Sequence, residues 1–373
     1  MPALSFQSIS KAYRGRPALE ALSFDVEPQS FTVICGPPKA GKSVLFRLLV
    51  GLEQPDAGCI MLAGEDITRL SAAQRAIGYV PQSFALYPHL TVRQNIAYPL
   101  TLARAPQAEI ARRVDRAAGI LSIAHLLAKT PDQLSGGEKQ RVAVARGLLK
   151  NADVFVLDDP LVGLDYKLRE RLMDELKGLR EELKATFLYA TSDSLEALTM
   201  AQRLVVLDAG RLVEHDEATR IYHDPGHARS LDLIGFPHAN LLKGRAEGTR
   251  LTAGPLTFGL AEPLPAAEVL VGLRPEALKL GTGAGIDFQG RVRLVENLGG
   301  EAVVYAQAGG QDLTLSLPLS GEPPPDFDAA VALTVDPGTL MLFDAASGRR
   351  LTFRAAQAEL RGSECDSGPR NSA

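Results

Sequence analysis

Two stretches of the sequence combine glycine with lysine or serine at spacings that suit the binding of phosphate. The first, GPPKAGKS, has the form Gly-x-x-x-x-Gly-Lys-Ser. In such a loop, main-chain N–H groups bind phosphate oxygens, the lysine reaches the outer phosphates and the serine hydroxyl binds Mg²⁺. The residues of this loop that we expect to contact a nucleotide are Gly36, Pro37, Pro38, Lys39, Ala40, Gly41, Lys42, Ser43 and Val44.

The second stretch, LSGGEKQRVAVARGLL, runs from Leu134 to Leu149 and reads as the start of a helix. Ser135 and Glu138 have the spacing of a capping box, which alone would make this a well-capped surface helix. Gly136 and Gly137, however, leave main-chain N–H groups open at the positive end of the helix. The chain therefore has two phosphate-binding devices, and this duplication calls for an explanation.

Several other candidate site residues come directly or shortly after short apolar runs. These runs are the predicted strands that would position the phosphate- and metal-binding residues. Such runs alternate with helical patterns over about the first 235 residues, which predicts a mainly parallel sheet covered by helices. The runs are Phe31–Cys35, Ile77–Val80, Val154–Leu157, Thr186–Tyr189 and Leu204–Leu207. Ligands of open α/β sheets bind beyond the carboxyl ends of the strands. We therefore expect one pocket to collect the residues that follow four of these runs, namely Gly36, Gln82, Asp158, Asp159 and Ser192.

Asp158 ends a hydrophobic run far downstream of the loop. On its own, an aspartate in this position is more often a helix cap or a turn residue. With a phosphate-binding loop upstream, it suits a ligand of the Mg²⁺ ion that accompanies a nucleotide. The predicted metal ligands are therefore Ser43 and Asp158.

The pattern of the chain predicts two domains and a tail. Residues 1–236 form an α/β nucleotide-binding domain with a helical insertion at about 88–150, which includes Gln107–Leu127 and Glu138–Leu149. Residues 237–355 are rich in Gly and Pro and predict a small all-β module. Its strand-like runs are Val269–Leu273, Arg291–Val295, Ala302–Ala306, Leu313–Leu317 and Ala330–Val335. The polar tail, 356–373, is expected to be disordered.

Composition restricts the possible classes of protein. The chain has 373 residues, 46% hydrophobic and 23% charged, with a net charge of −4, so no nucleic-acid partner is indicated. It shows no secretory signal and no apolar run of roughly 18 residues. Cys35, Cys59 and Cys365 are isolated and indicate neither disulfides nor a zinc site. We expect a cytoplasmic protein that would reach a membrane only by docking on another chain.

These motifs resemble those of the ATP-binding cassette (ABC) ATPases. LSGGEKQ resembles the family's signature, Tyr79–Gln82 its glutamine loop and Pro160–Asp165 its D-loop. The resemblance implies ATP and Mg²⁺ as cofactors, Gln82 as a metal and catalytic contact and Asp165 as a nucleotide contact. It also places Tyr13 where the family stacks an aromatic ring on adenine, although an ordinary surface tyrosine is the alternative.

The resemblance extends to one branch of the family and to nearly the whole chain except the tail. Ala85–Leu100 is similar to the segment by which sugar-importer ATPases meet their permeases. GFPHANLL, VGLRPEALKL, VENLGGE and LMLFDAASGRRL resemble the regulatory β domain of the maltose-type importers, an OB-like (TOBE) domain. The implied protein is the ATPase subunit of a carbohydrate or polyol importer, peripheral to the cytoplasmic face of the inner (plasma) membrane. The implied partners are integral-membrane permease subunits, a second ATPase subunit and, indirectly, an extracytoplasmic substrate-binding protein.

In this family two ATPase domains pair head to tail, with ATP between the phosphate loop of one and the signature of the other. The resemblance thus accounts for the two phosphate-binding devices, because each serves a different ATP. Two unlike ATPases in one importer would be reminiscent of some bacterial glycerol uptake systems. The sequence does not name the substrate.

The chain departs from the family at catalytic positions. Asp159 replaces a Glu that polarises the attacking water, and Ser192 replaces a His that contacts the γ-phosphate. Pro38 has no amide hydrogen, Lys39 replaces a Gly and Val44 replaces a Thr. A misplacement of ~1 Å can cost ~10²-fold in rate, and loss of a proton-handling group ~10²–10⁴-fold. We therefore predict a site that binds ATP but hydrolyses it poorly, with the intact signature completing the active site of a different ATPase subunit.

Three alternatives stay open at this point. Asp159 and Ser192 could be tolerated variants in an active homodimer. The chain could be a soluble regulator that senses nucleotide without driving transport. A soluble cassette ATPase of DNA repair or translation is the third, but such proteins usually carry two cassettes or a long coiled coil, and neither is present here.

Overall fold

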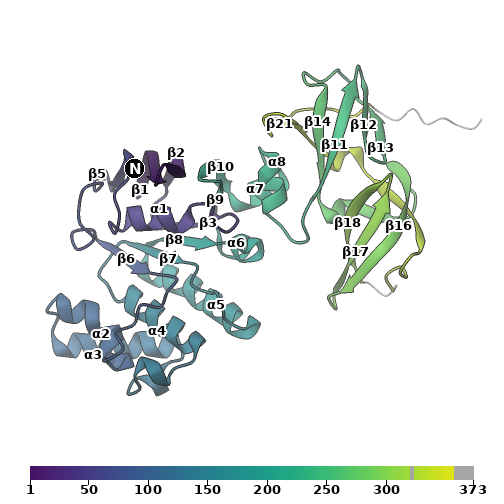
Figure 1. Ribbon diagram of the computed structural model, residues 1–373. Coiled ribbons are helices and arrows are strands. Elements are labelled where there is room, and N and C mark those ends of the chain that lie inside the picture. The colour runs from purple at the N-terminus through teal and green to yellow at the C-terminus, as the bar shows by residue number, and fades with distance from the viewer. Residues whose placement is uncertain (320–322, 357–373) are drawn as a thin grey trace, which may run out of the picture. The chain divides into compact units, whose positions relative to one another are not determined.

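The computed structural model of the chain describes residues 1–319 and 323–356 (Figure 1). It divides into two compact units, Met1–Phe236 and Pro237–Ala373. The tail that the sequence predicts to be disordered lies, apart from Ala356, outside the described residues. Each unit is described below by itself.

The first unit is built around a six-stranded sheet in the order β10-β9-β3-β8-β7-β6. Its strands are β3 (Phe31–Cys35), β6 (Ile77–Val80), β7 (Val154–Asp158), β8 (Thr186–Thr191), β9 (Arg203–Asp208) and β10 (Arg211–Glu217). All neighbours pair in parallel except the edge strand β10. Every residue of β3, β7 and β8 is buried, as expected for strands covered on both faces. The prediction of a mainly parallel sheet is confirmed.

A second sheet in this unit is antiparallel and was not anticipated from the sequence. It has the order β2-β1-β4-β5 and comprises β1 (Leu4–Tyr13), β2 (Arg16–Val26), β4 (Ala57–Leu62) and β5 (Glu65–Asp66). Register shifts interrupt the pairing of β1 with β2 and of β1 with β4. Because each shift breaks the alternation of apolar and polar residues, the strand signal in the sequence is weak.

Helix α1 (Lys42–Leu49) lies in the core between the two sheets. Its buried residues Leu45 and Phe46 belong to the same hydrophobic cluster as Phe6 of β1 and Ile34 of β3. Its carboxyl end is held by Arg75, a buried side chain that donates four hydrogen bonds to main-chain oxygens. The acceptors are Leu48 O and Leu49 O, both at 2.6 Å, Thr68 O at 2.9 Å and Leu70 O at 3.0 Å. This arrangement fixes α1 relative to the segment that leads into β6.

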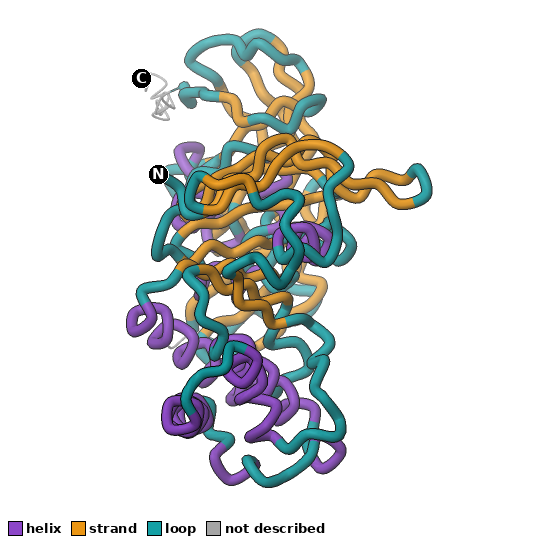
Figure 2. The backbone as a smooth tube through the Cα atoms, turned by 90° about the vertical axis from the view of Figure 1, so that its left-hand side faces the viewer, coloured by secondary structure: helices purple, strands orange, loops and turns teal. Residues whose placement is uncertain are grey.

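The remaining helices pack into a second core on the other side of the six-stranded sheet. In Figure 1, α2 (Val92–Leu102), α3 (Gln107–Ile120) and α4 (Gly136–Leu148) lie together beyond β6 and β7. The other helices are α5 (Tyr166–Leu183), α6 (Ser194–Met200), α7 (Ala218–His223) and α8 (Ala228–Leu233). Figure 2 shows the helices in purple and the strands in orange. The predicted helix Gln107–Leu127 is wrong after Ile120, because α3 ends there and a separate 3₁₀ turn follows at Ala124–Leu126.

The second unit consists of two antiparallel sheets that enclose one hydrophobic core. One sheet, β13-β12-β11-β14-β20-β21, contains β11 (Asn240–Glu247), β12 (Arg250–Ala253), β13 (Leu256–Gly259), β14 (Glu268–Leu273), β20 (Met341–Asp344) and β21 (Arg350–Leu351). The other, β15-β19-β16-β17-β18, contains β15 (Leu278–Leu280), β16 (Ile286–Asn297), β17 (Glu301–Ala308), β18 (Gln311–Pro318) and β19 (Ala330–Val335). The predicted all-β module is confirmed.

Candidate nucleotide site

The loop that follows β3 contains a tight turn built by two residues that are unusual for such a loop. The Ala40 N–H donates to Pro37 O at 3.1 Å, Pro38 occupies the second position of the turn, and Lys39 has a φ of 70° at the third. Proline at the second position and a positive φ at the third are the features of a type II turn. Pro38 and Lys39 therefore form a defined loop conformation, at the expense of one amide hydrogen.

The left-handed conformation of Lys39 leads to a stability prediction. A side chain at positive φ costs about 1 kcal/mol, and glycine removes this cost. Lys39→Gly should raise the free energy of unfolding of the first unit by up to about 1 kcal/mol, measured by urea unfolding followed by circular dichroism. Lys39→Ala is the matched control, because it removes the same charge but keeps the unfavourable φ. Equal stabilisation by both variants would show that charge, and not the main chain, is responsible.

Two glycines of the loop are required by close packing. A Cβ on Gly36 would lie 2.1 Å from Leu207 O, and one on Gly41 would lie 2.7 Å from the Leu19 side chain. Gly41 also has a φ of 103° and is the N-cap of α1, which no side chain caps and whose first turn holds no acidic residue. Among the residues that the structure describes, no side chain caps the first N–H groups of α1, and this fits a site for a phosphate group.

Lys42 and Ser43 begin α1 and lie beside the carboxylate at the end of β7. Lys42 is buried, which lowers the pKa of its ammonium group, and its Nζ donates to Gly36 O at 2.6 Å and Pro37 O at 3.1 Å. The Ser43 hydroxyl donates to Asp158 Oδ1 at 3.0 Å. This pair of oxygen ligands from two distant segments is of the kind that Mg²⁺ prefers.

Asp158 is also contacted by a residue to which the sequence assigned no role of its own. The Tyr79 hydroxyl, from β6, donates to Asp158 Oδ2 at 3.4 Å. Asp158 is only 4% exposed, and this burial raises the pKa of its carboxyl group. Both oxygens of Asp158 are therefore oriented by neighbours, so the direction in which they could bind a metal is fixed.

Asp159 has an unusual main-chain conformation at the point where β7 ends. Its φ is 51°, and its N–H donates to Ala190 O of the adjacent strand β8 at 2.9 Å. Burial, followed by the nearby charge of Glu196, raises the pKa of the Asp159 carboxyl to about 6. Ser192 comes directly after β8 and is exposed, and Gln82 is exposed two residues after β6.

The strand order brings together the ends that carry the predicted site residues. β3 pairs with β8, β8 with β7 and β7 with β6, so the strands preceding Gly36, Ser192, Asp158 and Gln82 are consecutive neighbours. In this register Cys35 lies opposite Thr191. The carboxyl ends of these strands therefore lie side by side, as the expected convergence requires.

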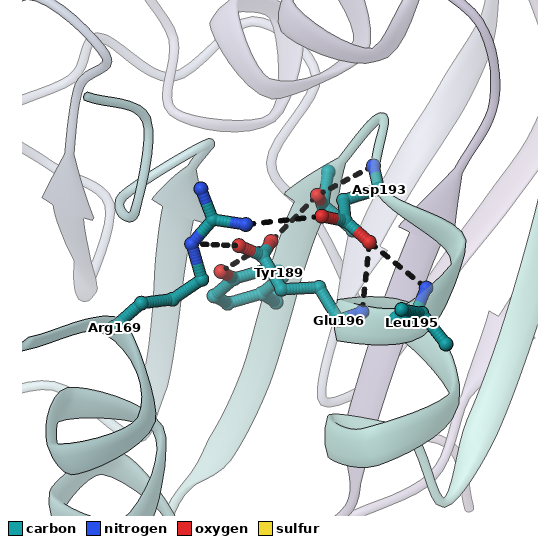
Figure 3. A network of polar contacts seen from close by, with 6 residues as sticks. Arg169, Tyr189, Asp193, Leu195 and Glu196 are labelled. Carbon is teal, nitrogen blue, oxygen red and sulfur yellow. Dashed lines mark hydrogen bonds and ion pairs between the residues drawn. The ribbon is translucent and has the colours of Figure 1, made fainter. Parts of the chain in front are cut away.

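A polar network that sequence reasoning missed lies beside Ser192 (Figure 3). Glu196, only 5% exposed, accepts hydrogen bonds from the Tyr189 hydroxyl at 2.9 Å and from the Thr191 hydroxyl at 2.6 Å. Arg169 of α5 donates to Asp193 Oδ2 at 3.1 Å and lies 3.8 Å from Glu196 Oε1. The five side chains come from α5, β8 and the start of α6, and no local sequence pattern indicates that they meet.

Tyr13 lies at the end of β1 with an exposed ring that its hydroxyl holds in place. The hydroxyl bonds to Glu53 and accepts from Arg47 at 3.4 Å, and Arg47 Nε donates to Glu53 Oε1 at 2.6 Å. Lys11 Nζ lies 5.7 Å from the ring centroid. A ring that is anchored at its edge leaves a face available for stacking on a nucleobase.

The signature residues occupy the amino end of α4. Ser135 Oγ accepts from Glu138 N at 3.3 Å, and Ser135 N donates to Glu138 Oε2 at 2.7 Å, which confirms the predicted capping box. A Cβ on Gly136 would have no atom within 4 Å. Asp165 caps α5 by accepting from Leu168 N at 3.0 Å. Across the described residues, no hydrogen bond or ion pair is recorded between the loop Gly36–Ser43 and these residues of α4 and α5.

Comparison with known proteins identifies the family. A family described as ABC transporter matches residues 19–162, and one described as TOBE domain matches residues 271–343. The sn-glycerol-3-phosphate import ATP-binding protein UgpC of Cereibacter sphaeroides is 38% identical over 94% of this chain and 100% of its own length. An uncharacterised ABC transporter ATP-binding protein, y4oS of Sinorhizobium fredii, is 36% identical over 94% of this chain and 95% of its own length. The chain belongs to the ABC transporter ATP-binding proteins.

Solved structures agree with this assignment of the first unit. The post-hydrolysis dimer of the ATP-binding cassette MJ0796, bound to ADP and phosphate, is 28% identical and covers 58% of this chain and 98% of its own, with a TM-score of 0.54. The resemblance to ABC ATPases is therefore confirmed, as is the TOBE character of the β unit, and the chain is an ABC-type ATPase. ATP is the ligand of this family. None of the helices in the described part of the chain has the length and hydropathy to span a bilayer.

Proposed function

We propose that the chain is the ATP-binding subunit of an ABC importer for a sugar, a polyol or a polyol phosphate, bound to the cytoplasmic face of the membrane. The observation that carries this proposal is similarity over about 94% of the chain to proteins named for sn-glycerol-3-phosphate import. The similarity includes the β unit as well as the ATPase unit. A soluble cassette ATPase of repair or translation would not account for this unit.

In this proposal, Mg-ATP binds at the edge of the sheet where β3, β6, β7 and β8 end. The N–H groups of the loop Gly36–Val44 and the ammonium of Lys42 hold the phosphates. Ser43, Asp158 and Gln82 hold Mg²⁺, which would neutralise charge on the phosphate oxygens. The face of the Tyr13 ring stacks on the adenine.

The Lys42 ammonium provides a direct test of nucleotide binding. Lys42→Ala removes a charged donor from the floor of the loop, and such a hydrogen bond contributes about 1.5–3 kcal/mol. We therefore expect ATP affinity, measured by equilibrium dialysis with Mg²⁺ present, to fall roughly 10–100-fold. Lys39→Ala, in the same loop, is the matched control and should change affinity less than about threefold, because it keeps the main-chain N–H through which residue 39 is proposed to contact phosphate and removes only an exposed side chain. Unchanged affinity in Lys42→Ala would argue against this binding site.

The same site is proposed to hydrolyse ATP slowly, while the signature of this chain completes the active site of a second ATPase subunit. Asp159 offers a carboxylate one methylene shorter than the family's Glu, and Ser192 lacks the imidazole that contacts the γ-phosphate. The signature, in contrast, keeps its capping box and its open glycine. In the head-to-tail arrangement of the family, these two observations fit a heterodimer with one competent site better than a homodimer.

The segment Ala85–Leu100 is proposed as the contact with integral-membrane permease subunits. Although its first part is irregular, it is fixed from two sides. The Asn95 side chain accepts from Tyr87 N at 2.8 Å and donates to Tyr87 O at 3.1 Å and to Leu90 O at 3.0 Å. Arg146 of α4 donates to Ala85 O at 2.6 Å and stacks over the Tyr87 ring at 5.6 Å. A loop that is ordered before binding loses less conformational entropy on docking.

Purification of the tagged chain from membranes of its own host tests the proposal as a whole. We expect integral-membrane permeases and a second, unlike ATPase chain to co-purify with it, and a soluble substrate-binding protein to associate more loosely. Recovery of the chain from the soluble fraction without permeases would contradict the importer assignment. Recovery with permeases but with no second ATPase chain would leave the importer and contradict the heterodimer.

A further inference from the structure

Arg169 lies one helical turn after the residue that ends the D-loop. The D-loop, Pro160–Asp165, connects the end of β7 to α5, and Asp165 caps that helix through Leu168 N. Arg169 N then donates to Asp165 O at 2.9 Å. Because an α-helix is stiff over one turn, the side chain of Arg169 and the end of the D-loop move together.

The Arg169 guanidinium connects α5 to the start of α6 (Figure 3). Its Nη1 donates to Asp193 Oδ2 at 3.1 Å, while Asp193 Oδ1 caps α6 by accepting from Leu195 N at 2.9 Å and Glu196 N at 3.1 Å. Its Nε lies 3.8 Å from Glu196 Oε1. Both acceptor side chains are therefore held by other bonds, so Arg169 is attached to a fixed group.

The same contacts hold the segment Thr191–Asp193 from both sides of Ser192. The Asp193 N–H donates to the Thr191 hydroxyl at 3.0 Å, and that hydroxyl donates to Glu196 Oε2 at 2.6 Å. On the far side, Asp159 N donates to Ala190 O at 2.9 Å. The chain thus forms a closed ring, from the end of β7 through the D-loop, α5 and Arg169 to α6 and β8, and back to β7.

The D-loop is partly exposed and is held by long main-chain hydrogen bonds. Two long main-chain hydrogen bonds lie within it, from Val162 N to Asp159 O at 3.4 Å and from Leu164 N to Leu161 O at 3.3 Å. The side chain of Val162 is 50% exposed and that of Tyr166, directly after the loop, is 72% exposed. Leu161 and Leu164 are buried in the hydrophobic core, so the exposed residues of the loop take their position from these leucines and from α5, which Arg169 ties down.

We propose that Arg169 is a positioning residue that couples the segment Thr191–Asp193, which follows the strand beside the phosphate loop because Cys35 pairs with Thr191, to the D-loop. This coupling rests on the proposed binding of ATP at the loop Gly36–Val44. When nucleotide orders the segment around Ser192, the Arg169–Asp193 pair carries that order to α5 and the D-loop. The network keeps its contacts although residue 192 is a serine and not a histidine. The positioning role of Arg169 therefore does not depend on catalysis in this chain.

Hydrogen exchange of the full-length chain, with and without Mg-ATP, tests this coupling. In the natural chain, Mg-ATP should slow amide exchange in three segments, Gly36–Val44, Thr191–Glu196 and the D-loop. In Arg169→Gln, the first two should still be protected and ATP affinity should stay within about threefold, whereas protection of the D-loop should fall by roughly tenfold. Arg171→Gln is the matched control, an exposed arginine on the same helix, and should behave as the natural chain.

A second variant, Asp193→Asn, tests the same coupling independently if Arg169→Gln folds poorly. Asp193→Asn retains a side-chain oxygen to cap α6 but removes the charge that holds Arg169, so it should give the same selective loss at the D-loop. Full ATP-dependent protection of the D-loop in both variants would overturn the coupling alone. Absence of protection at Gly36–Val44 in the natural chain would overturn the nucleotide site and the coupling with it. A purely structural role would lower the melting temperature and leave ATP-dependent protection of the D-loop unchanged.

Discussion

Asp159→Glu combined with Ser192→His is expected to raise steady-state ATP hydrolysis by the chain about 10²–10⁴-fold. The two changes restore the carboxylate that polarises the attacking water and the imidazole that contacts the γ-phosphate. Their effects should not multiply, because residues that act as a unit are non-additive. Either single variant is therefore expected to recover only part of the gain.

The surroundings of both positions are compatible with the change. Ser192 is exposed, so an imidazole there meets no packed core. Asp159 is half-buried, with a φ of 51° that an aspartate adopts more readily than most residues, so Asp159→Glu adds a small conformational cost. The bond from its N–H to Ala190 O is a main-chain bond and is retained. The restored carboxylate would then extend one methylene further from the same main-chain position.

The matched control is Asp159→Asn with Ser192→His, which has the imidazole but no carboxylate at the end of β7. It should bind Mg-ATP and stay slow. Equal gains from both double variants would show that the carboxylate is unimportant. No gain from Asp159→Glu with Ser192→His, despite normal binding, would show that another feature limits the rate.

Gly136→Asp is expected to abolish most ATP hydrolysis by the assembled complex while leaving this chain's own nucleotide affinity unchanged. A Cβ at Gly136 meets no atom within 4 Å, and an aspartate in the first turn of a helix is favourable to that helix. We therefore expect the substitution to leave the folding and stability of the isolated chain unchanged. In the complex, its carboxylate would face the phosphates held by the second ATPase subunit, and we expect a loss of at least ~10²-fold.

Gln107→Asp is the matched control for this experiment. It places the same residue in the first turn of α3, at an exposed position that carries no proposed contact. ATPase activity of the complex should then equal that of the natural complex. Normal activity in the Gly136→Asp complex would mean that the signature of this chain does not complete a working site. Lost affinity for Mg-ATP in the isolated Gly136→Asp chain would place the glycine in the chain's own site instead.

The strands and the predicted edge of the sheet could be read from the sequence because their signals are local. β3, β7 and β8 are short, wholly buried and mostly apolar runs, each followed by a residue of the predicted site, and the parallel order places the ends of these strands side by side. The capping box of α4 is equally local, since Ser135 and Glu138 lie within one turn. The antiparallel sheet was missed because register shifts in β1 interrupt its alternation.

The contacts that orient the site could not be predicted, because they join side chains far apart in the sequence. Arg75 reaches back to the end of α1, Tyr79 reaches across to Asp158, and Arg169 spans α5 to α6. Each pairing depends on the packing of whole elements and not on a spacing. The type II turn at Pro38 also emerged only from its main-chain bond and from the φ of the following residue.

The central claim is that this site binds ATP and hydrolyses it slowly. A single-turnover experiment tests this claim most directly. The natural chain, in excess over radiolabelled ATP with Mg²⁺, is sampled over time, and bound nucleotide is measured in parallel by equilibrium dialysis. We predict that the nucleotide is bound and is converted to ADP at least ~10²-fold more slowly than by Asp159→Glu with Ser192→His. Conversion by the natural chain at the rate of that variant would contradict the claim and favour an active homodimer.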